Sequence, residues 1–129
     1  MNLQAPIAAV LIHVADTAAG LDWYQRAFPQ AVRRRPEGFD FELLQLGSVA
    51  IEIVPADAKC ASGPAGSVVY WWVDDLRQAV GRMQQLGAPL YRGPMAIEDG
   101  LGMCQVRDPW GNCIGLRGPL LADPAEPPA

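Results

Sequence analysis

Residues that commonly do chemistry are few in this chain. It has one histidine, His13, and three cysteines, Cys60, Cys104 and Cys113, with no CxxC pair and no Cys/His spacing. This pattern argues against both a disulfide framework and a structural zinc site. A lone histidine is more often a hydrogen-bonded wall residue than a catalytic base. We therefore expect free thiols and a site that depends mainly on other side chains.

Aromatic side chains form the densest group of candidate binding residues. They lie in the segment SVVYWWV at 67–73, where Tyr70 and Trp72 alternate with Val69 and Trp71. Tyr70 and Trp72 could be the stacking walls of an open site, or they could simply fill a core between sheets.

Charge and composition limit the partners. The formal net charge of −4 speaks against a nucleic-acid surface and mildly favours cationic or neutral ligands. The only basic run, at 33–35, is more typical of a solvated strand or turn than of an anion site. No apolar run approaches the ~20 residues that span a bilayer, and the N-terminal segment does not read as a signal peptide. We expect a cytoplasmic protein that binds neither nucleic acid nor membrane.

A repeat positions these residues. The sequence IHVADTAAGLDWYQRAF at 12–28 recurs as WWVDDLRQAVGRMQQLG at 71–87, so that Val14 and Asp16 return as Val73 and Asp75. In each copy a strand-like run ends in an acidic residue and passes into an amphipathic helix. A repeat of this length predicts two copies of one supersecondary unit, whose shared surface is the natural place for a site.

The two halves predict the same order of elements: a strand, a helix and three strands. Asp16 and Asp74 or Asp75 are the expected helix caps. The first half, module 1, spans about 6–55, with a strand at 7–14, a helix to about Phe28, and strands near 31–35, 39–46 and 49–54. A linker follows at 56–66. Module 2 spans about 67–118, with a strand at 67–73, a helix ended by Gly87, and strands near 88–92, 102–107 and 112–117. The single domain therefore covers 1–118, and we expect the Pro-rich tail at 119–129 to be disordered.

Three phrases resemble a known superfamily. They are RDPWGNCIGL at 107–116, VDDLRQAVGRMQQLGAP at 73–89 and VADTAAGLDWYQRAFP at 14–29, and they resemble the vicinal oxygen chelate superfamily. That superfamily holds glyoxalase I, extradiol dioxygenases, and fosfomycin and bleomycin resistance proteins. The resemblance implies an α+β fold of two βαβββ modules, whose curled mixed sheet forms a cup with the helices outside. It also implies a homodimer.

The resemblance also locates four possible metal-ligand points, on the first and last strand of each module. In this sequence they fall on Ala9, Glu52, Val68 and Gly115. A divalent ion needs about three protein ligands, and of these four residues only Glu52 can supply one. We therefore expect neither a metal nor another cofactor, as in the metal-free bleomycin resistance-like members.

Alternation along the strands predicts which side chains line the cup. The expected ligand-binding residues are Leu11, His13, Glu52, Tyr70, Trp72, Met103, Gln105 and Arg117. Glu52 could be a relic carboxylate bound to Arg117 or water, or it could recognise a cation. This lining suits an organic ligand held by stacking and a few hydrogen bonds.

Two functions from different classes follow. The first is a metal-free binding protein that sequesters or carries an aromatic or cationic small molecule, as in antibiotic resistance. The second is an enzyme, either a glyoxalase-like lyase or isomerase with His13 and Glu52 as acid and base, or a metal-dependent, dioxygenase-like enzyme whose ligands have moved. A third alternative is a structural or regulatory domain whose cup is closed by its own aromatic side chains.

Overall fold

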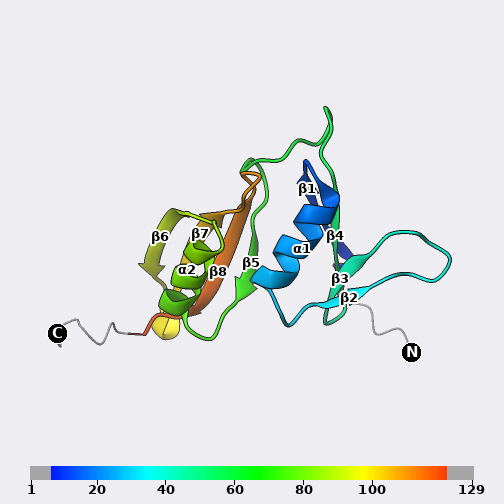
Figure 1. Ribbon diagram of the computed structural model, residues 1–129. Coiled ribbons are helices and arrows are strands. Elements are labelled where there is room, and N and C mark those ends of the chain that lie inside the picture. Colours follow the sequence, from blue (N-terminus) through cyan, green and yellow to red (C-terminus); the bar gives the residue numbers. More distant parts are fainter. Residues whose placement is uncertain (1–6, 122–129) are drawn as a thin grey trace. The chain divides into compact units, whose positions relative to one another are not determined.

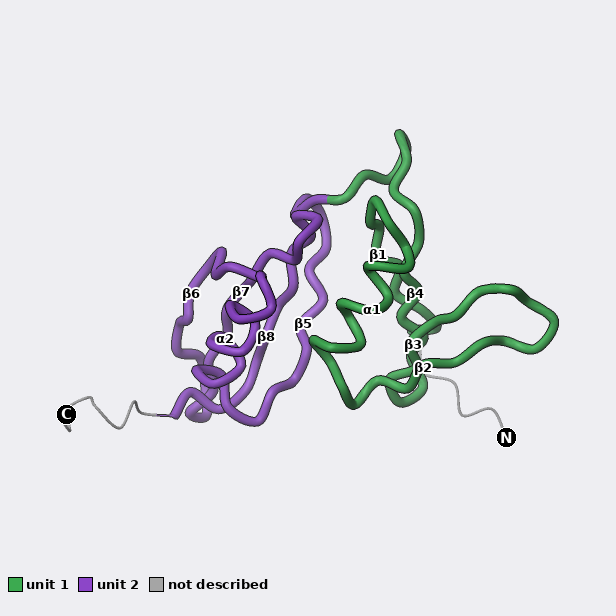
Figure 2. Tube along the Cα trace, in the orientation of Figure 1, with its two compact units in different colours: residues 1–62 green, residues 63–129 purple. Residues whose placement is uncertain are grey.

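The computed structural model describes residues 7–121. The chain forms two compact units, residues 1–62 and 63–129 (Figure 2). The boundary between them falls within the segment that the sequence predicts as a linker. Unit 1 contains β1 (Ala9–Val14), α1 (Thr17–Ala27), β2 (Val32–Arg34), β3 (Leu43–Leu46) and β4 (Val49–Pro55). Unit 2 contains β5 (Val69–Trp72), α2 (Leu76–Gln85), β6 (Leu90–Ala96), the short 3-10 helix η1 (Glu98–Gly100), β7 (Leu101–Arg107) and β8 (Cys113–Pro119). The predicted α+β fold of two βαβββ modules is confirmed.

Each unit has its own four-stranded mixed sheet (Figure 1). The strand orders are β1-β4-β3-β2 and β5-β8-β7-β6, and in both sheets the first two strands are parallel and the others antiparallel. The repeat also holds in the strand register, because Leu11 lies beside Glu52 in unit 1 and Tyr70 lies beside Gly115 in unit 2. Parallel pairing is possible here because a long connection, which includes the helix, separates the two strands in the sequence.

The acidic residues of the repeat cap the two helices. A carboxylate oxygen of Asp16 accepts a hydrogen bond from the backbone N–H of Ala19 at 3.1 Å, and Asp75 does the same for Gln78 at 3.2 Å. Both bonds satisfy a backbone donor that the first turn of a helix leaves unpaired. Asp75, rather than Asp74, is therefore the second cap.

Each helix covers one face of its sheet and buries the core there. In unit 1, α1 contacts β3 and β4, and its Leu21 and Tyr24 are buried together with Leu44 and Ile51 of the sheet. Gly20 allows the close approach, since a Cβ at this position would lie 2.8 Å from the side chains of Val14 and Ile53. In unit 2, α2 contacts β6, β7 and β8, and the shared core consists of Leu76, Met83, Trp71, Cys104, Val106, Ile114 and Leu116.

Strands β2, β3 and β5 are shorter than the sequence predicts, β3 by the most residues, and β6 runs to Ala96 rather than ending near residue 92. Strand β3 begins at Leu43, whereas the alternating pattern of FDFELLQL predicts a strand from residue 39. The Phe39 and Phe41 rings instead contact each other at 5.8 Å between centroids, and both are exposed. The backbone N–H of Phe39 bonds to the carbonyl of Pro36, which turns the chain away. Residues 35–42 therefore form a loop that extends from the sheet (Figure 1).

The end of the described chain is held by hydrogen bonds. Strand β8 runs to Pro119, the N–H of Leu120 bonds to the Gly100 carbonyl, and Arg77 Nε donates to the Leu121 carbonyl at 2.9 Å. Residues 119–121 of the proposed disordered tail are thus bound to unit 2, and the rest of that tail lies outside the described residues. Neither α1 nor α2, the two α-helices within residues 7–121, is long enough to cross a bilayer.

Candidate functional site

The five predicted site residues of unit 2 share one face of its sheet. Side chains alternate along a strand, and Cys104, Val106, Ile114 and Leu116 are buried toward α2. Their neighbours in sequence therefore lie on the opposite face, which we call the open face of unit 2. Its residues are Tyr70 and Trp72 of β5, Cys113, Gly115 and Arg117 of β8, Met103, Gln105 and Arg107 of β7, and Arg92 and Met95 of β6.

A small polar network holds Tyr70 on this face. Gln105 Nε2 donates to the Tyr70 hydroxyl at 2.9 Å, and the Cys113 thiol donates to Gln105 Oε1 at 3.3 Å. The Arg117 guanidinium lies 5.0 Å from the centre of the Tyr70 ring, within cation–π range. Tyr70 is therefore held at its hydroxyl by Gln105 and on its ring by Arg117.

The Tyr70 ring also explains the glycine on the neighbouring strand. A Cβ added at Gly115 would lie 2.5 Å from Tyr70 Cδ1, far inside van der Waals contact. Gly115 is the position at which the resemblance places a metal ligand. In this chain the space beside its Cα is filled by the tyrosine ring.

Trp72 is the most exposed of the described aromatic groups on this face. Its residue is 56% exposed, whereas the neighbouring Trp71 is 6% exposed and belongs to the core. The Trp72 indole N–H donates to Asp74 at 3.2 Å. Its register partner on β8 is Arg117, which in turn lies beside Met103. The ring is thus available for stacking, with a cation on the neighbouring strand.

The three predicted site residues of unit 1 share the face of its sheet opposite α1. Val14, Ile51 and Ile53 are buried, so the alternate positions Leu11, His13 and Glu52 point the other way. Leu11 is 52% exposed and lies beside Glu52 on β4. The His13 carbonyl accepts a hydrogen bond from Ser62 Oγ at 2.6 Å.

Of the four residues at the expected metal-ligand points, Ala9, Glu52 and Gly115 lie on strands β1, β4 and β8, and Val68 comes just before β5. Across residues 7–121, no three histidine, cysteine, aspartate or glutamate side chains come together in a group that could hold a metal ion.

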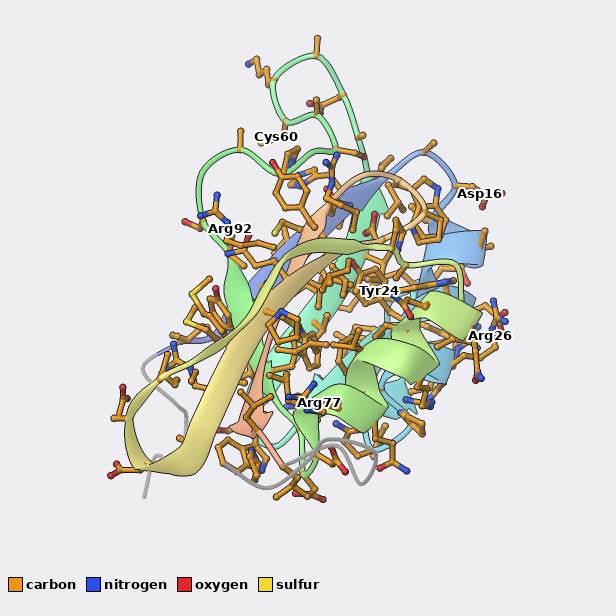
Figure 3. The ribbon with its side chains drawn as sticks, turned by 90° about the vertical axis from the view of Figure 1, so that its left-hand side faces the viewer. Asp16, Tyr24, Arg26, Cys60, Arg77 and Arg92 are labelled. Atoms are coloured by element: carbon orange, nitrogen blue, oxygen red, sulfur yellow. The ribbon has the colours of Figure 1, made fainter. Side chains whose placement is uncertain are left out.

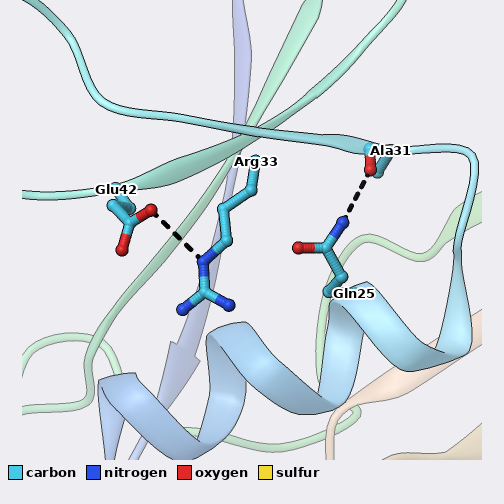
Figure 4. Close-up of polar contacts among 4 residues, drawn as sticks. All are labelled: Gln25, Ala31, Arg33 and Glu42. Carbon is cyan, nitrogen blue, oxygen red and sulfur yellow. Dashed lines mark hydrogen bonds and ion pairs between the residues drawn. The ribbon is translucent and has the colours of Figure 1, made fainter.

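Unit 1 also has a cleft that the sequence does not predict. Its volume is about 400 Å³, and two ion pairs lie among its walls: Arg33 with Glu42 at 3.3 Å (Figure 4) and Arg35 with Asp40 at 3.8 Å. The remaining wall residues are Thr17, Ala18 and Leu21 of α1, Phe41, and the consecutive β4 residues Glu52, Ile53, Val54 and Pro55. Consecutive residues of one strand point to opposite faces of the sheet. These four residues therefore line the cleft with one edge of β4 and not with a single face of the sheet. Two arginines of the basic run at 33–35 therefore form ion pairs at this cleft.

Cys104 and Cys113 are not activated nucleophiles. Burial raises the pKa of the Cys104 thiol to about 11. Burial also raises the pKa of Cys113, although the positive charges of Arg107 and Arg92 oppose that shift. Both thiols are therefore protonated at neutral pH, and thiolate is the form that reacts. Cys60, as the sequence suggests, is an exposed free thiol.

The DPWGN phrase has a structural role. The Asp108 carboxylate is buried and accepts hydrogen bonds from the N–H groups of Trp110 and Asn112, both at 2.8 Å, and from Asn112 Nδ2 at 2.9 Å. The Asn112 side chain in turn accepts from the N–H of Gly63 at 2.8 Å. These bonds fix the turn between β7 and β8 and hold the start of unit 2.

Two arginines of the open face are missed by the sequence reasoning. Arg107 follows Gln105 in the same phase of β7, so alternation could have found it. Arg92 lies beside Gln105 only because the register between β6 and β7 is irregular, and no sequence pattern reveals such a shift.

Comparisons with known proteins agree with this architecture. No protein-family model and no curated protein matches the sequence. Among solved structures, a glyoxalase/bleomycin resistance protein/dioxygenase family enzyme from Burkholderia phytofirmans PsJN has 20% identity and a TM-score of 0.67, covering 90% of this chain and 100% of that chain. TnmS3, an antibiotic binding protein from Streptomyces sp. CB03234, has 21% identity and a TM-score of 0.66, covering 92% and 99%. A glyoxalase/bleomycin resistance protein/dioxygenase superfamily member from Sphaerobacter thermophilus DSM 20745 has 16% identity and a TM-score of 0.68, covering 91% and 99%. The predicted resemblance is thus confirmed at the level of the fold.

Proposed function

We propose that this protein is a metal-free small-molecule binding protein that sequesters or carries an aromatic organic ligand. The observation that carries the proposal is the open face of unit 2, where Trp72 is exposed and Tyr70 is held flat over Gly115. Aromatic walls with a few fixed polar groups suit an organic ligand that binds by stacking and is oriented by hydrogen bonds. That the fold neighbour TnmS3 is an antibiotic binding protein supports this class of function.

The metal-free part of the proposal rests on the residues at the four ligand points. Ala9 and Val68 have no donor atom, and a larger side chain at Gly115 would overlap the Tyr70 ring. Titration of the purified protein with nickel, zinc, manganese and iron salts tests it. We expect no stoichiometric binding in calorimetry, whereas one tight equivalent per chain would contradict the proposal.

Tryptophan fluorescence tests the stacking wall directly. The chain has four tryptophans, and Trp23 and Trp71 are buried, so a ligand on the open face should quench Trp72 most strongly. We expect planar aromatic antibiotics to quench the native protein and Trp72→Phe to remove most of that quenching. Trp110→Phe is the matched control, because Trp110 lies at the β7–β8 turn and not among the strand residues of this face. Equal quenching in the two variants would place the ligand elsewhere.

The alternative is an enzyme that uses His13 and Glu52. Both side chains lie on the face of the unit 1 sheet opposite α1. Glu52 of β4 pairs with Leu11 of β1, and His13 is two residues further along β1. Turnover of a glutathione hemithioacetal that disappears in His13→Ala would favour this alternative over simple binding.

A further inference from the structure

The four strands of unit 2 have an unusual charge. They contain three arginines, Arg92, Arg107 and Arg117, and no aspartate or glutamate. The chain as a whole has a formal net charge of −4. This one sheet is therefore locally positive in an acidic protein.

All three arginines lie on the open face. Arg117 and Arg107 alternate with the buried Leu116 and Val106, and Arg92 is the register partner of Gln105. In Figure 3, Arg92 lies on the side of β6 away from α2, the helix that carries Arg77. The three positive charges are thus concentrated where the aromatic side chains are, while the Asp74 carboxylate accepts a hydrogen bond from the Trp72 indole N–H.

The guanidinium groups are not neutralised by carboxylates. Within residues 7–121, none of these three arginines forms an ion pair. Arg117 lies over the Tyr70 ring at 5.0 Å and Arg107 over the Tyr91 ring at 4.9 Å. The Nε–H of Arg107 donates to the Gly111 carbonyl at 2.6 Å, so this arginine has only its terminal N–H groups left for a ligand. A guanidinium that stacks by its plane keeps N–H groups at its edge, and carboxylates and phenolates are strong acceptors for such donors.

We infer that the ligand of the open face is a planar aromatic anion. Its ring stacks on Trp72 and Tyr70, and its carboxylate, sulfonate or phenolate accepts hydrogen bonds from the arginines of the face. This inference rests on the proposed binding function and deepens it. It also reverses the expectation from net charge, which favours cationic ligands.

Three probes with the same ring and different charge test the inference. They are anthracene carboxylate, anthracene methanol and anthracene methylammonium, titrated into the full-length protein at pH 7.5 and followed by quenching of tryptophan emission. We expect the carboxylate to bind about tenfold more tightly than the ammonium probe, and this preference to shrink with added salt because exposed charges are screened.

Substitutions of single arginines test which of them bind the carboxylate of the probe. Arg92→Gln should weaken binding of the carboxylate roughly three- to tenfold and leave the neutral probe nearly unchanged. Arg117→Gln should weaken the carboxylate at least as much, and it also removes the contact of Arg117 with the Tyr70 ring. Arg82→Gln on α2 is the matched control, since it removes one positive charge from the other side of the sheet, and it should leave all three affinities as they are. Circular dichroism confirms that each variant is folded.

The remaining outcomes separate the inference from the proposed function. If all probes bind but the ammonium binds as tightly as the carboxylate, the inference is wrong and the binding function stands. If no probe binds, both fail. If Arg117→Gln changes the mass in sedimentation but no probe affinity, the arginines serve a protein contact and the inference is overturned.

Discussion

At the residue scale, Gly115 and Tyr70 depend on each other. A methyl group at residue 115 would push the Tyr70 ring off β8 and break its hydrogen bond to Gln105. We expect Gly115→Ala to lower the free energy of unfolding by roughly 1–3 kcal/mol, the usual cost of overpacking. It should also abolish ligand quenching. Denaturant unfolding followed by circular dichroism measures the first effect.

The matched control is Gly81→Ala. Gly81 lies inside α2, and a Cβ there meets nothing within 4 Å. Alanine is the better helix former, so this variant should gain roughly 0.5–1 kcal/mol. A Gly115→Ala protein as stable as the native one would show that Tyr70 is free to move aside.

Cys104 gives stability a pH dependence in the alkaline range. Burial raises its pKa from 9.0 to about 11, so the folded protein keeps a proton that the unfolded chain loses. The contribution of Cys104 to the free energy of unfolding is constant below pH 9 and falls as the pH rises toward 11. The loss is roughly 1.4 kcal/mol for each unit by which folding raises the pKa. Comparing unfolding of the native protein and Cys104→Ala across this range isolates the effect. A loss of stability between pH 9 and 11 that is the same in both proteins would contradict it.

For single residues, the sequence predicts the face of the sheet on which a side chain lies better than it predicts the atoms that the side chain contacts. Alternation along the strands was enough to put Tyr70, Gln105 and Arg117 on one face. It could not show that Gln105 bonds to the Tyr70 hydroxyl, because that depends on side-chain rotamers and on the register of three strands. It also could not place the charge of Arg92 on this face, since Arg92 pairs with Gln105 only through an irregular register.

At the element scale, the strands and helices with strong local signals were predictable. The Asp16 and Asp75 caps fix where the helices begin, and apolar periodicity fixes the faces that they bury. The segment at 39–42 was not predictable, because its alternation of Phe39 and Phe41 is that of a strand. The turn at Pro36 and the contact between the two rings oppose that pattern.

Because β3 begins only at Leu43, one backbone amide of β4 has no strand partner. The N–H groups of Ala50 and Ala56 point to β1, so those of Ile51 and Ile53, in the other phase, point toward β3. The pairing with β3 reaches Ile51 but not Ile53. In hydrogen exchange measured by NMR, we expect the Ile53 amide to exchange about a hundredfold faster than that of Ile51.

Val54 is the internal control for this measurement, because its amide points to β1 and should be protected. Equal protection of Ile51 and Ile53 would mean that residues 39–42 continue the strand, as the sequence pattern predicts, and that the cleft of unit 1 is closed in solution.

At the scale of the whole molecule, the duplication preserves the framework more strictly than the surfaces. Both units keep the strand order, the capped helix and the pairing of the first strand with the last. The faces opposite the helices differ, with Leu11, His13 and Glu52 in one unit, and aromatic and arginine side chains in the other. Each face therefore offers a ligand a different chemistry.

Exposed apolar side chains on these faces suggest that a second copy of the chain covers part of them. Leu11 of unit 1 is 52% exposed and Met95 of unit 2 is 41% exposed, and exposed apolar surface commonly marks an interface. The resemblance also implies a homodimer. We expect sedimentation equilibrium to give twice the 13.9 kDa mass of one chain. Leu11→Asp should shift the mass toward the monomer, because a carboxylate is costly to bury in an interface. Gln84→Asp on the exposed side of α2 should leave the dimer intact. A mass of one chain at every concentration would instead mean that a single copy of this protein forms the whole binding site.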